Sequence, residues 1–291
     1  MDPFWRQVDV APSYVYARAI TRRYARSFYF ASRFLPAEKR WATYALYGFC
    51  RYADNLIDLQ RTRGREELLS ELACLAAETS LAYRTGESEH PIIKSFIHTA
   101  RRYGIPERYP LDLIKGVEMD AAFNGYESYD DLYLFAYRVA GVVGLMMTYL
   151  LGYRDETAFP YAEKLGIAMQ LTNILRDIQE DKELGRIYIP AAELRQFGVT
   201  PEQILSERMT PQLRALMEFQ VERAHACYTE AERGIALLDR KSRFAIHTAS
   251  RLYQAILKKI ALADYNPFVG RAFVPAPHKL AILLQEYVRR R

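Results

Sequence analysis

Aspartates that are paired one helical turn apart are the residues of this sequence best suited to chemistry. Asp177 and Asp181 lie in the segment 170–181, which has no glycine or proline and whose apolar residues recur at three- and four-residue steps. At about 100° per residue, Gln170 and Asn173 project from the same helix face as the two aspartates. Like charges at this spacing destabilise a bare helix by about 0.2–0.5 kcal/mol. A bound divalent cation would offset this cost.

A second stripe of the same kind occurs upstream, in the segment 44–58. Tyr47, Arg51, Asp54 and Asp58 project from one helix face, and the two aspartates are again one turn apart. Carboxylates embedded in apolar helical sequence need partners, because burying an unpaired charge is costly. If the two helices face each other, four carboxylates converge on one cavity. Oxygen ligands of this kind suit Mg²⁺, which keeps its other positions for water and substrate phosphates.

The composition describes a globular protein with a mixed surface. Half of the 291 residues are hydrophobic and 13% are aromatic, which is ample for a core. The 40 Lys and Arg against 35 Asp and Glu do not form a nucleic-acid footprint, so no nucleic-acid partner is expected. The single cysteines Cys50, Cys74 and Cys227 have no ligand spacing and indicate reduced thiols in the cytoplasm. The five scattered histidines argue against zinc.

Helical periodicity dominates the chain, and strand signals are scarce. We expect one all-α domain over residues 1–291, because the joints are short and no repeat or linker interrupts the chain. The predicted helices are 12–31, 37–60, 64–85, 91–103, 107–123, 128–152, 155–184, 209–238, 241–264 and 276–289.

No segment of the sequence predicts a membrane span or a signal peptide. The longest apolar run, 139–153, is broken by glycines and is shorter than the about 20 residues that cross a bilayer. The N-terminal residues lack a basic stretch followed by an apolar one. A cytoplasmic protein is expected, either soluble or peripheral at the inner face of the membrane.

The motifs of this chain resemble those of the squalene/phytoene synthase family, and the resemblance covers nearly the whole sequence. The matching motifs are Ser27-Phe28-Tyr29, Tyr47-Gly48-Phe49-Cys50-Arg51, Asp54-x-x-x-Asp58, Tyr137 to Gly144, Gln170-Leu171-x-Asn173-Ile174-Leu175-Arg176-Asp177-x-x-x-Asp181, Gly185 to Pro190, Arg251-Leu252-Tyr253 and Arg271. The resemblance implies an all-α isoprenoid synthase-type helical bundle around a central cavity.

The resemblance also implies a reaction. It is the Mg²⁺-dependent head-to-head condensation of two prenyl diphosphates through a cyclopropyl diphosphate intermediate. Farnesyl diphosphate would give squalene or dehydrosqualene, and geranylgeranyl diphosphate would give phytoene. NADPH is expected only if the product is squalene. These products are hydrocarbons, so peripheral contact with a membrane is expected, helped by the basic tail 289–291.

The site residues are assigned from the two stripes and from the resemblance together. Catalytic roles are expected for Asp54, Asp58, Asp177, Asp181, Arg51 and Tyr47. Metal ligands are expected to be Asp54, Asp58, Asn173, Asp177 and Asp181. Substrate contacts are expected from Ser27, Phe28, Arg51, Val139, Ala140, Gly141, Gly144, Gln170, Asn173, Arg176, Tyr253 and Arg271.

Three features of the sequence each allow two interpretations. The arginines at positions 18, 22, 23 and 26 form either a solvated basic face or a diphosphate clamp. Gly141 and Gly144 mark either close helix packing or a kink beside an apolar ligand. The loop after Gly185 is either a connector or a cover over the site. Relatives often carry a hydroxyl at the position of Ala25 and a tyrosine at that of Phe135, so we expect fewer phosphate contacts near Ala25 and no hydroxyl group at Phe135 to steer a cation.

Other functions remain as alternatives. A class I terpene cyclase or a head-to-tail prenyltransferase would use similar magnesium chemistry, but it would be expected to show adjacent aspartates where this chain has Asp54-Asn55. Fold relatives that assist respiratory-complex assembly without catalysis would be expected to have lost aspartates. The oligomeric state is not predicted.

Overall fold

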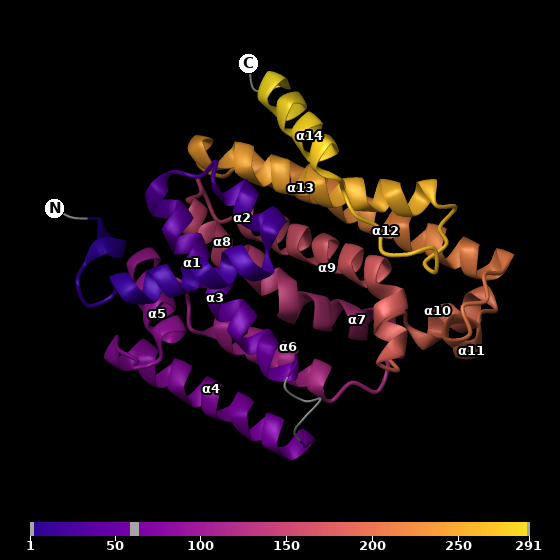
Figure 1. The fold of residues 1–291 in the computed structure, drawn as a ribbon, viewed down its shortest axis with the longest axis horizontal. Coiled ribbons are helices and arrows are strands. Elements are labelled where there is room, and N and C mark those ends of the chain that lie inside the picture. Colours follow the sequence, from indigo (N-terminus) through magenta and orange to yellow (C-terminus); the bar gives the residue numbers. More distant parts are fainter. Residues whose placement is uncertain (1–2, 59–63, 290–291) are drawn as a thin grey trace.

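The chain folds almost entirely into helices (Figure 1). The computed structural model describes residues 3–58 and 64–289. Side chains are described throughout these ranges except at positions 26, 27, 58 and 289. Within this part of the chain, extended pairing is limited to an isolated antiparallel bridge between Tyr153 and Leu238. The predicted all-α class is therefore confirmed.

The N-terminal part of the bundle comprises η1 (Phe4–Arg6), α1 (Ala11–Tyr24), α2 (Arg26–Ser32), α3 (Ala37–Asp58), α4 (Arg65–Thr85), α5 (Pro91–Tyr103) and α6 (Arg108–Ala121). It is followed by α7 (Tyr129–Ala136), the π-helical turn η3 (Tyr137–Gly141), α8 (Val142–Leu151) and α9 (Ala158–Glu183). The C-terminal part comprises α10 (Ala191–Phe197), α11 (Pro201–Leu205), α12 (Pro211–Ile235), α13 (Arg240–Leu262) and α14 (Ala276–Arg289).

The first predicted helix, 12–31, is broken in the structure. Ala25 leaves the helical region at φ −129° and ψ 64°, and it separates α1 from α2. The break lets α2 lay its rings on α3, where Phe28 stacks on Tyr47 and Tyr29 stacks on Tyr44, both with centroids 5.3 Å apart. These are tertiary contacts between two helices, and no glycine or proline near Ala25 indicates the break in the sequence.

Two short helices, α10 and α11, were missing from the prediction. They lie in the stretch between α9 and α12 that was left without a helix. A sequence signal was present for α11, because Thr200 precedes Pro201 and its backbone N–H donates to Gln203 Oε1 at 3.2 Å. Helices of this length carry too few residues for apolar periodicity to reveal them.

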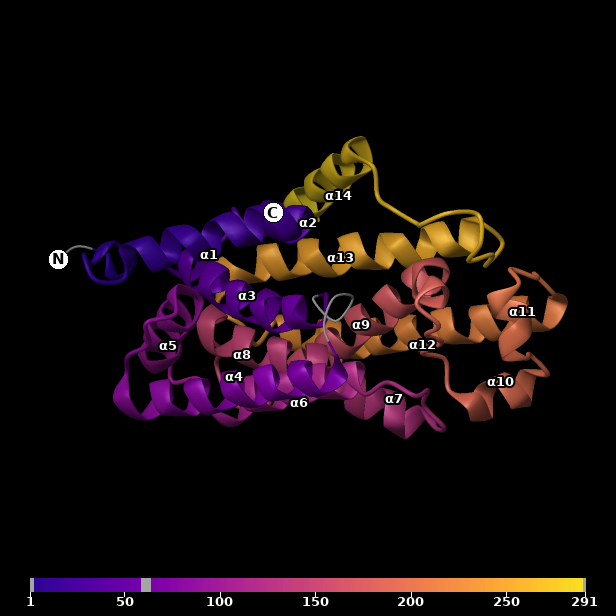
Figure 2. The same cartoon turned by 60° about the horizontal axis from the view of Figure 1, so that its bottom comes forward.

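The two predicted aspartate helices occupy the middle of the bundle. Figure 2 shows α3 and α9 between α13 on one side and α6 on the other. One apolar core joins α1, α3, α4, α5, α6 and α8, and a second joins α7 with α9 to α13. Tyr137, in the turn η3, packs against both cores. The continuous helix formed by α7, η3 and α8 therefore ties the two halves together.

Glycines let α9 lie directly on this long helix. A Cβ on Gly144 would overlap the backbone oxygen of Ala162, and a Cβ on Gly166 would overlap that of Ala140. Close helix packing thus accounts for the absence of a side chain at Gly144. The π-helical turn lies at the same crossing, and such turns occur often at functional sites.

The same long helix passes a length and composition test for a membrane span. At 23 residues, Tyr129–Leu151 is longer than the apolar run 139–153, because the helix begins before that run. In the structure 56% of the apolar window is buried inside the protein, as in the core helix of a water-soluble fold. Length and apolar composition alone are weak grounds for placing this helix in a bilayer.

The crossing of α8 and α9 yields a stability prediction. We expect Gly144→Ala to lower the free energy of unfolding by about 1–3 kcal/mol, because the added methyl group forces two backbones apart. Urea denaturation followed by circular dichroism measures this change. Gly64→Ala is the matched control, since a Cβ there meets no atom within 4 Å. Equal stability of the two variants would contradict the packing role of Gly144.

Candidate active site

The predicted polar face of α9 begins with an amide pair. Asn173 Nδ2 donates to Gln170 Oε1 across a long 3.4 Å. The other amide atom, Asn173 Oδ1, is buried and has no hydrogen-bond partner among the described residues. A buried acceptor that lacks a donor is costly for the fold. This oxygen is therefore suited to coordinate a cation such as Mg²⁺, which takes oxygen ligands.

Asp177 is held by two arginines. Arg176 forms a bidentate pair with it, with Nε 2.7 Å from Oδ1 and Nη2 2.5 Å from Oδ2. Arg271, in the segment after α13, places its Nε 3.0 Å from Asp177 Oδ1 and its Nη1 3.3 Å from Glu180. The arginines expected to bind diphosphate thus contact an expected metal ligand, which brings the anion-binding and cation-binding groups together.

Asp181 has no comparable arginine pair. Burial, together with the charges of Asp177 and Asp120, raises the pKa of its carboxyl group to about 7, and Arg186 only partly opposes the rise. The aspartate also borders a small pocket that Arg186 and Tyr188 help to line. A desolvated carboxylate beside other carboxylates gains from a bound cation, so the donor set of this face fits Mg²⁺.

The structure adds residues to the site that sequence reasoning missed. Asp120, on α6, accepts from Arg186 Nη1 at 2.9 Å and from the Tyr188 hydroxyl at 2.5 Å. These contacts hold the loop after Gly185 back against Asp181, whose backbone oxygen also accepts from the Arg186 N–H. Arg186 and Tyr188 were visible as part of a motif, but Asp120 is isolated on its helix and carried no signal.

The stripe on α3 faces an aromatic wall. The Arg51 guanidinium lies 4.6 Å from the ring centroid of Tyr24. Burial raises the pKa of Tyr47, and the charges of Asp54 and Tyr253 add to the rise while Arg51 opposes it. Burial raises the pKa of Tyr253, while the charge of Arg176 lowers it and that of Asp177 raises it. The two stripes are thus linked through Tyr47 and Tyr253.

The expected convergence of four carboxylates stays a prediction, because it includes Asp58. Within the described part of the chain, no three His, Cys, Asp or Glu side chains lie close enough to share one metal ion. The side chains of Asp58 and Ser27 lie outside the described residues, so these two assignments stay predictions. Asp54 is exposed at the C-terminal end of α3.

The remaining predicted substrate contacts lie on the long helix. Val139, Ala140 and Gly141 form most of the turn η3 and pack toward α6 and α9. Phe135, where relatives often have tyrosine, is buried and stacks on Tyr188 with ring centroids 5.6 Å apart. A hydroxyl group therefore stands next to this position, on Tyr188, although Phe135 itself has none. Whether this turn touches substrate stays a prediction.

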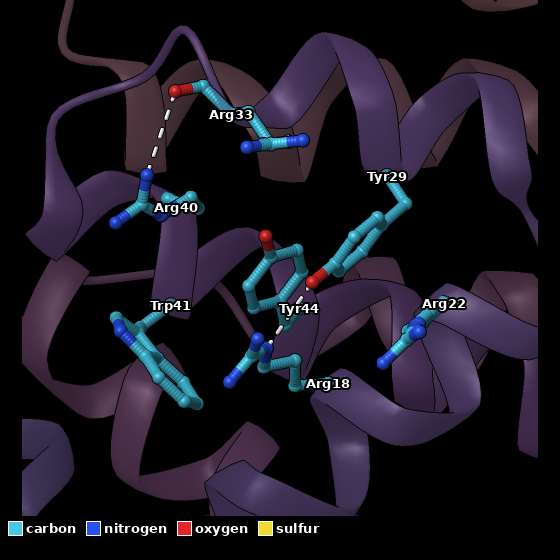
Figure 3. Close-up of a pocket in the computed structure, with 7 residues that line it drawn as sticks. All are labelled: Arg18, Arg22, Tyr29, Arg33, Arg40, Trp41 and Tyr44. Carbon is cyan, nitrogen blue, oxygen red and sulfur yellow. Dashed lines mark hydrogen bonds between the residues drawn. The ribbon is translucent and has the colours of Figure 1, made fainter.

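Two of the N-terminal arginines line a cavity that contains none of the predicted aspartates. Arg18 and Arg22 line a separate surface cavity together with Tyr29 and Tyr44 (Figure 3). Tyr29 and Phe28 are consecutive residues of α2, yet they stack on different tyrosines of α3. Both side chains are exposed, as a solvated basic face requires, and the alternative of a diphosphate clamp stays a prediction.

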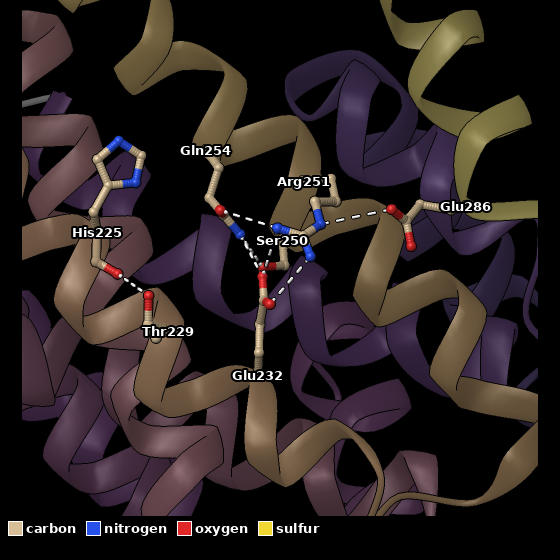
Figure 4. A network of polar contacts seen from close by, with 7 residues as sticks. All are labelled: His225, Thr229, Glu232, Ser250, Arg251, Gln254 and Glu286. Atoms are coloured by element: carbon tan, nitrogen blue, oxygen red, sulfur yellow. Dashed lines mark hydrogen bonds and ion pairs between the residues drawn. The ribbon is translucent and has the colours of Figure 1, made fainter. Parts of the chain in front are cut away.

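Arg251, which belongs to one of the motifs that resemble the family, forms ion pairs that connect helices. It pairs with Glu232 of α12 at 3.0 Å and with Glu286 of α14 at 3.6 Å (Figure 4). Gln254 donates to the same Glu232 at 2.7 Å. Arg251 thus connects three helices, whereas Tyr253, two residues on, is the member of this motif that lies by the site.

Comparisons with known proteins agree over almost the entire chain. The family described as Squalene/phytoene synthase matches residues 21–278. The 15-cis-phytoene synthase of Synechococcus elongatus is 37% identical over 289 residues, covering 94% of this chain and 92% of the relative. A crystal structure of a dehydrosqualene synthase in complex with ligand superposes with a TM-score of 0.90 at 30% identity and covers 99% of both chains. Squalene synthase HpnC from Alicyclobacillus acidocaldarius gives 0.83 at 28% identity, covering 90% of this chain and 98% of that one.

Asp181 provides a stability prediction with a defined pH dependence. Its pKa is about 7 in the folded protein, against the ordinary value of 3.8 for an aspartate in an unfolded chain, so ionised Asp181 destabilises the metal-free fold. The cost is complete above pH 7 and disappears as the pH falls toward 4. In EDTA at pH 8 we expect Asp181→Asn to raise Tm by about 2–4 °C, or about 1 kcal/mol after allowing for solvent screening.

The comparison with pH 5 and a control variant make this measurement specific. The gain in Tm should shrink at pH 5, where part of the wild-type cost has already gone. Glu183→Gln, at an exposed position on the same helix, should leave Tm within the scatter of the scans. A Tm for Asp181→Asn at or below that of the wild type at pH 8 would contradict the buried-charge account.

Proposed function

Since the chain belongs to the squalene/phytoene synthase family and condenses prenyl diphosphates head to head, we propose that its substrate is geranylgeranyl diphosphate and its product phytoene. The observation that carries this choice is the 37% identity to a phytoene synthase along nearly the full length of both proteins. Two substrate molecules are joined through a cyclopropyl diphosphate intermediate, and each diphosphate leaves as pyrophosphate. The family and its chemistry set aside the terpene cyclase, head-to-tail and non-catalytic alternatives.

A second candidate has its own support. The dehydrosqualene synthase superposes on almost the entire chain with a TM-score of 0.90, which favours farnesyl diphosphate as substrate. The two reactions differ in the length of the isoprenoid chain, and both proceed through the same ionisations of the diphosphate groups. Phytoene formation needs no reductant, in keeping with the lack of a Gly-x-Gly-x-x-Gly fingerprint, so NADPH is not expected.

We propose that Mg²⁺ is held by Asn173, Asp177 and Asp181 on α9 and by Asp54 and Asp58 on α3. The metal would supply positive charge to the departing diphosphate group. Arg51, Arg176 and Arg271 contribute guanidinium groups for the diphosphate oxygens, which they bind in a planar fork. Gln170 supports Asn173 through their shared amide contact.

The apolar side of the reaction falls to the aromatic residues. Phe28, Tyr47 and Tyr253 present ring faces, whose electrons stabilise a carbocation. The loop held by Asp120, Arg186 and Tyr188 would exclude water from the diphosphate end, so that water does not capture the cation. Val139, Ala140, Gly141 and Gly144 are assigned to the isoprenoid chain.

A product assay tests the proposal. Purified protein with Mg²⁺ and geranylgeranyl diphosphate, without NADPH, should form phytoene, a forty-carbon hydrocarbon that mass spectrometry of a hexane extract identifies. Farnesyl diphosphate should give little product. Asp177→Asn should reduce turnover by orders of magnitude with the circular dichroism spectrum unchanged, because it removes a metal ligand. A thirty-carbon product would select the second candidate, and full activity of the variant would overturn the assignment of Asp177.

We propose that the enzyme is cytoplasmic and contacts the inner face of the membrane through α14. Leu280, Leu284 and Val288 recur at four-residue steps on this helix and are 57%, 58% and 69% exposed. An apolar stripe of this kind suits the interface of a bilayer, where a hydrocarbon product would be released. The basic tail 289–291 would add attraction to anionic lipid.

Vesicle binding measures this contact. Co-sedimentation with vesicles of phosphatidylglycerol and phosphatidylcholine should fall several-fold for Leu284→Glu/Val288→Glu, because charges are placed on the apolar stripe. Leu205→Glu, which alters an exposed leucine on α11, is the control and should bind as the wild type does. Equal binding by all three proteins would rule out α14 as the contact.

A further inference from the structure

A strongly basic cavity lies outside the aspartate site. It has a volume of about 560 Å³ and opens between α1, α2 and the N-terminal half of α3 (Figure 3). Four arginines line it, Arg18 and Arg22 from α1, Arg33 from the end of α2 and Arg40 from α3. No acidic side chain is among its lining residues.

The positive charge of this cavity is not neutralised by the protein. None of the four arginines pairs with a carboxylate in the described ranges, and two carboxylates found at the first turn of α3 pair with other cations. Glu38 binds Arg102 at 2.9 Å, and Asp239 binds Lys39 at 2.6 Å. Four like charges around one cavity repel each other, so an anion bound there would gain several charge-assisted contacts.

The contacts these arginines do make are with neutral groups, and they leave donors free. Arg18 Nε donates to the Tyr29 hydroxyl at 3.2 Å, and Arg40 Nη1 reaches the Arg33 backbone oxygen at 3.4 Å. The bond from Arg18 lowers the pKa of Tyr29. Each guanidinium has five N–H donors, so most remain available to a ligand.

An aromatic wall gives the cavity a fixed shape. Tyr29 stacks on Tyr44, Trp41 meets Tyr44 edge-on with centroids 5.8 Å apart, and Trp5 stacks on Trp41 with centroids 6.3 Å apart. The Arg18 guanidinium lies 5.6 Å from the Trp41 ring centroid. Rigid rings beside guanidinium groups suit a ligand that joins a phosphate group to an apolar part.

This cavity is distinct from the aspartate site, although the two share a wall. On α2, Phe28 stacks on Tyr47 on the side of the aspartates, whereas Tyr29 stacks on Tyr44 inside the cavity. Tyr44 precedes Asp54 by ten residues, which is about 15 Å along the helix. A single diphosphate group does not reach both places.

We propose that this cavity is a second binding site for a diphosphate group, carried either by free pyrophosphate or by a prenyl diphosphate. Diphosphate matches the high charge of four guanidinium groups better than a singly charged anion does. The choice of diphosphate rests on the proposed function, because that reaction consumes two prenyl diphosphates and releases two pyrophosphates. The site gives a reactant or product of the enzyme a place to bind apart from the metal ligands.

Calorimetric titration of the full-length protein with pyrophosphate tests this site. EDTA is present throughout, so that no metal-bound diphosphate forms at the aspartates. We expect the wild type to bind and Arg33→Gln/Arg40→Gln to bind at least tenfold more weakly. The matched control is Arg84→Gln/Arg154→Gln, which removes two exposed arginines outside the cavity and should bind within twofold of the wild type.

Further variants and ligands separate the outcomes. Arg18→Gln is the second variant if the double change impairs folding, and it should also weaken binding. A thiolodiphosphate analogue of geranylgeranyl diphosphate separates the two sources, because tighter binding than pyrophosphate indicates a site for the prenyl substrate and equal binding indicates one for pyrophosphate. Arg176→Gln/Arg271→Gln checks that the heat does not come from the aspartate site.

Three results would overturn the proposal. The first is that the wild type does not bind pyrophosphate, and the second is that the cavity variants bind pyrophosphate as tightly as the wild type. The third is that the cavity variants bind more weakly only to vesicles of phosphatidylglycerol, which would assign the cavity to lipid headgroups. Turnover is not part of the readout. Failure of this inference therefore leaves the proposed reaction standing, and failure to form phytoene leaves the binding measurement interpretable.

Discussion

The repulsion among the carboxylates of α9 is the constraint on which the rest of the site depends. Asp177 is compensated by Arg176 and Arg271, while burial and the charges of Asp177 and Asp120 raise the pKa of Asp181, and Arg186, which is also bonded to Asp120, opposes only part of that rise. Together with the buried, unpartnered Asn173 Oδ1, this leaves one face of α9 short of positive charge. The fold accepts a destabilised ionisable group at the place where a metal-dependent reaction needs oxygen ligands.

Such a face is useful only if α9 cannot move away to relieve the repulsion. Gly144 and Gly166 bring the backbones of the long helix and α9 into direct contact, and α12 and α13 pack against α9 from other sides. The π-helical turn lies at that contact, so a closely packed crossing of two helices adjoins the predicted binding face. Rigid packing here fixes the ligands before substrate arrives.

The helix α2 separates two environments that both suit phosphate chemistry. Its Phe28 faces the aspartate side, and its Tyr29 faces the four-arginine cavity. The division depends on the break at Ala25, which sets the direction of α2 relative to α1. In a single straight helix over 12–31, these rings would follow the direction of α1 and would not lie flat on α3.

The sequence by itself determined the helical class, most helix positions and both aspartate stripes, because helical periodicity is a local property and Asp54, Asp177 and Asp181 each belong to such a pattern. The short helices α10 and α11 were missed because they are too short for apolar periodicity, and the break at Ala25 was missed because tertiary contacts of α2 accompany it. Only the tertiary structure brought Asp120 to Arg186 and Tyr188, and Arg271 to Asp177 across 94 positions of the chain. It also paired Arg251 with Glu232 and Glu286. Ion pairs between distant segments follow from how the helices pack, and residue type and local spacing do not encode them.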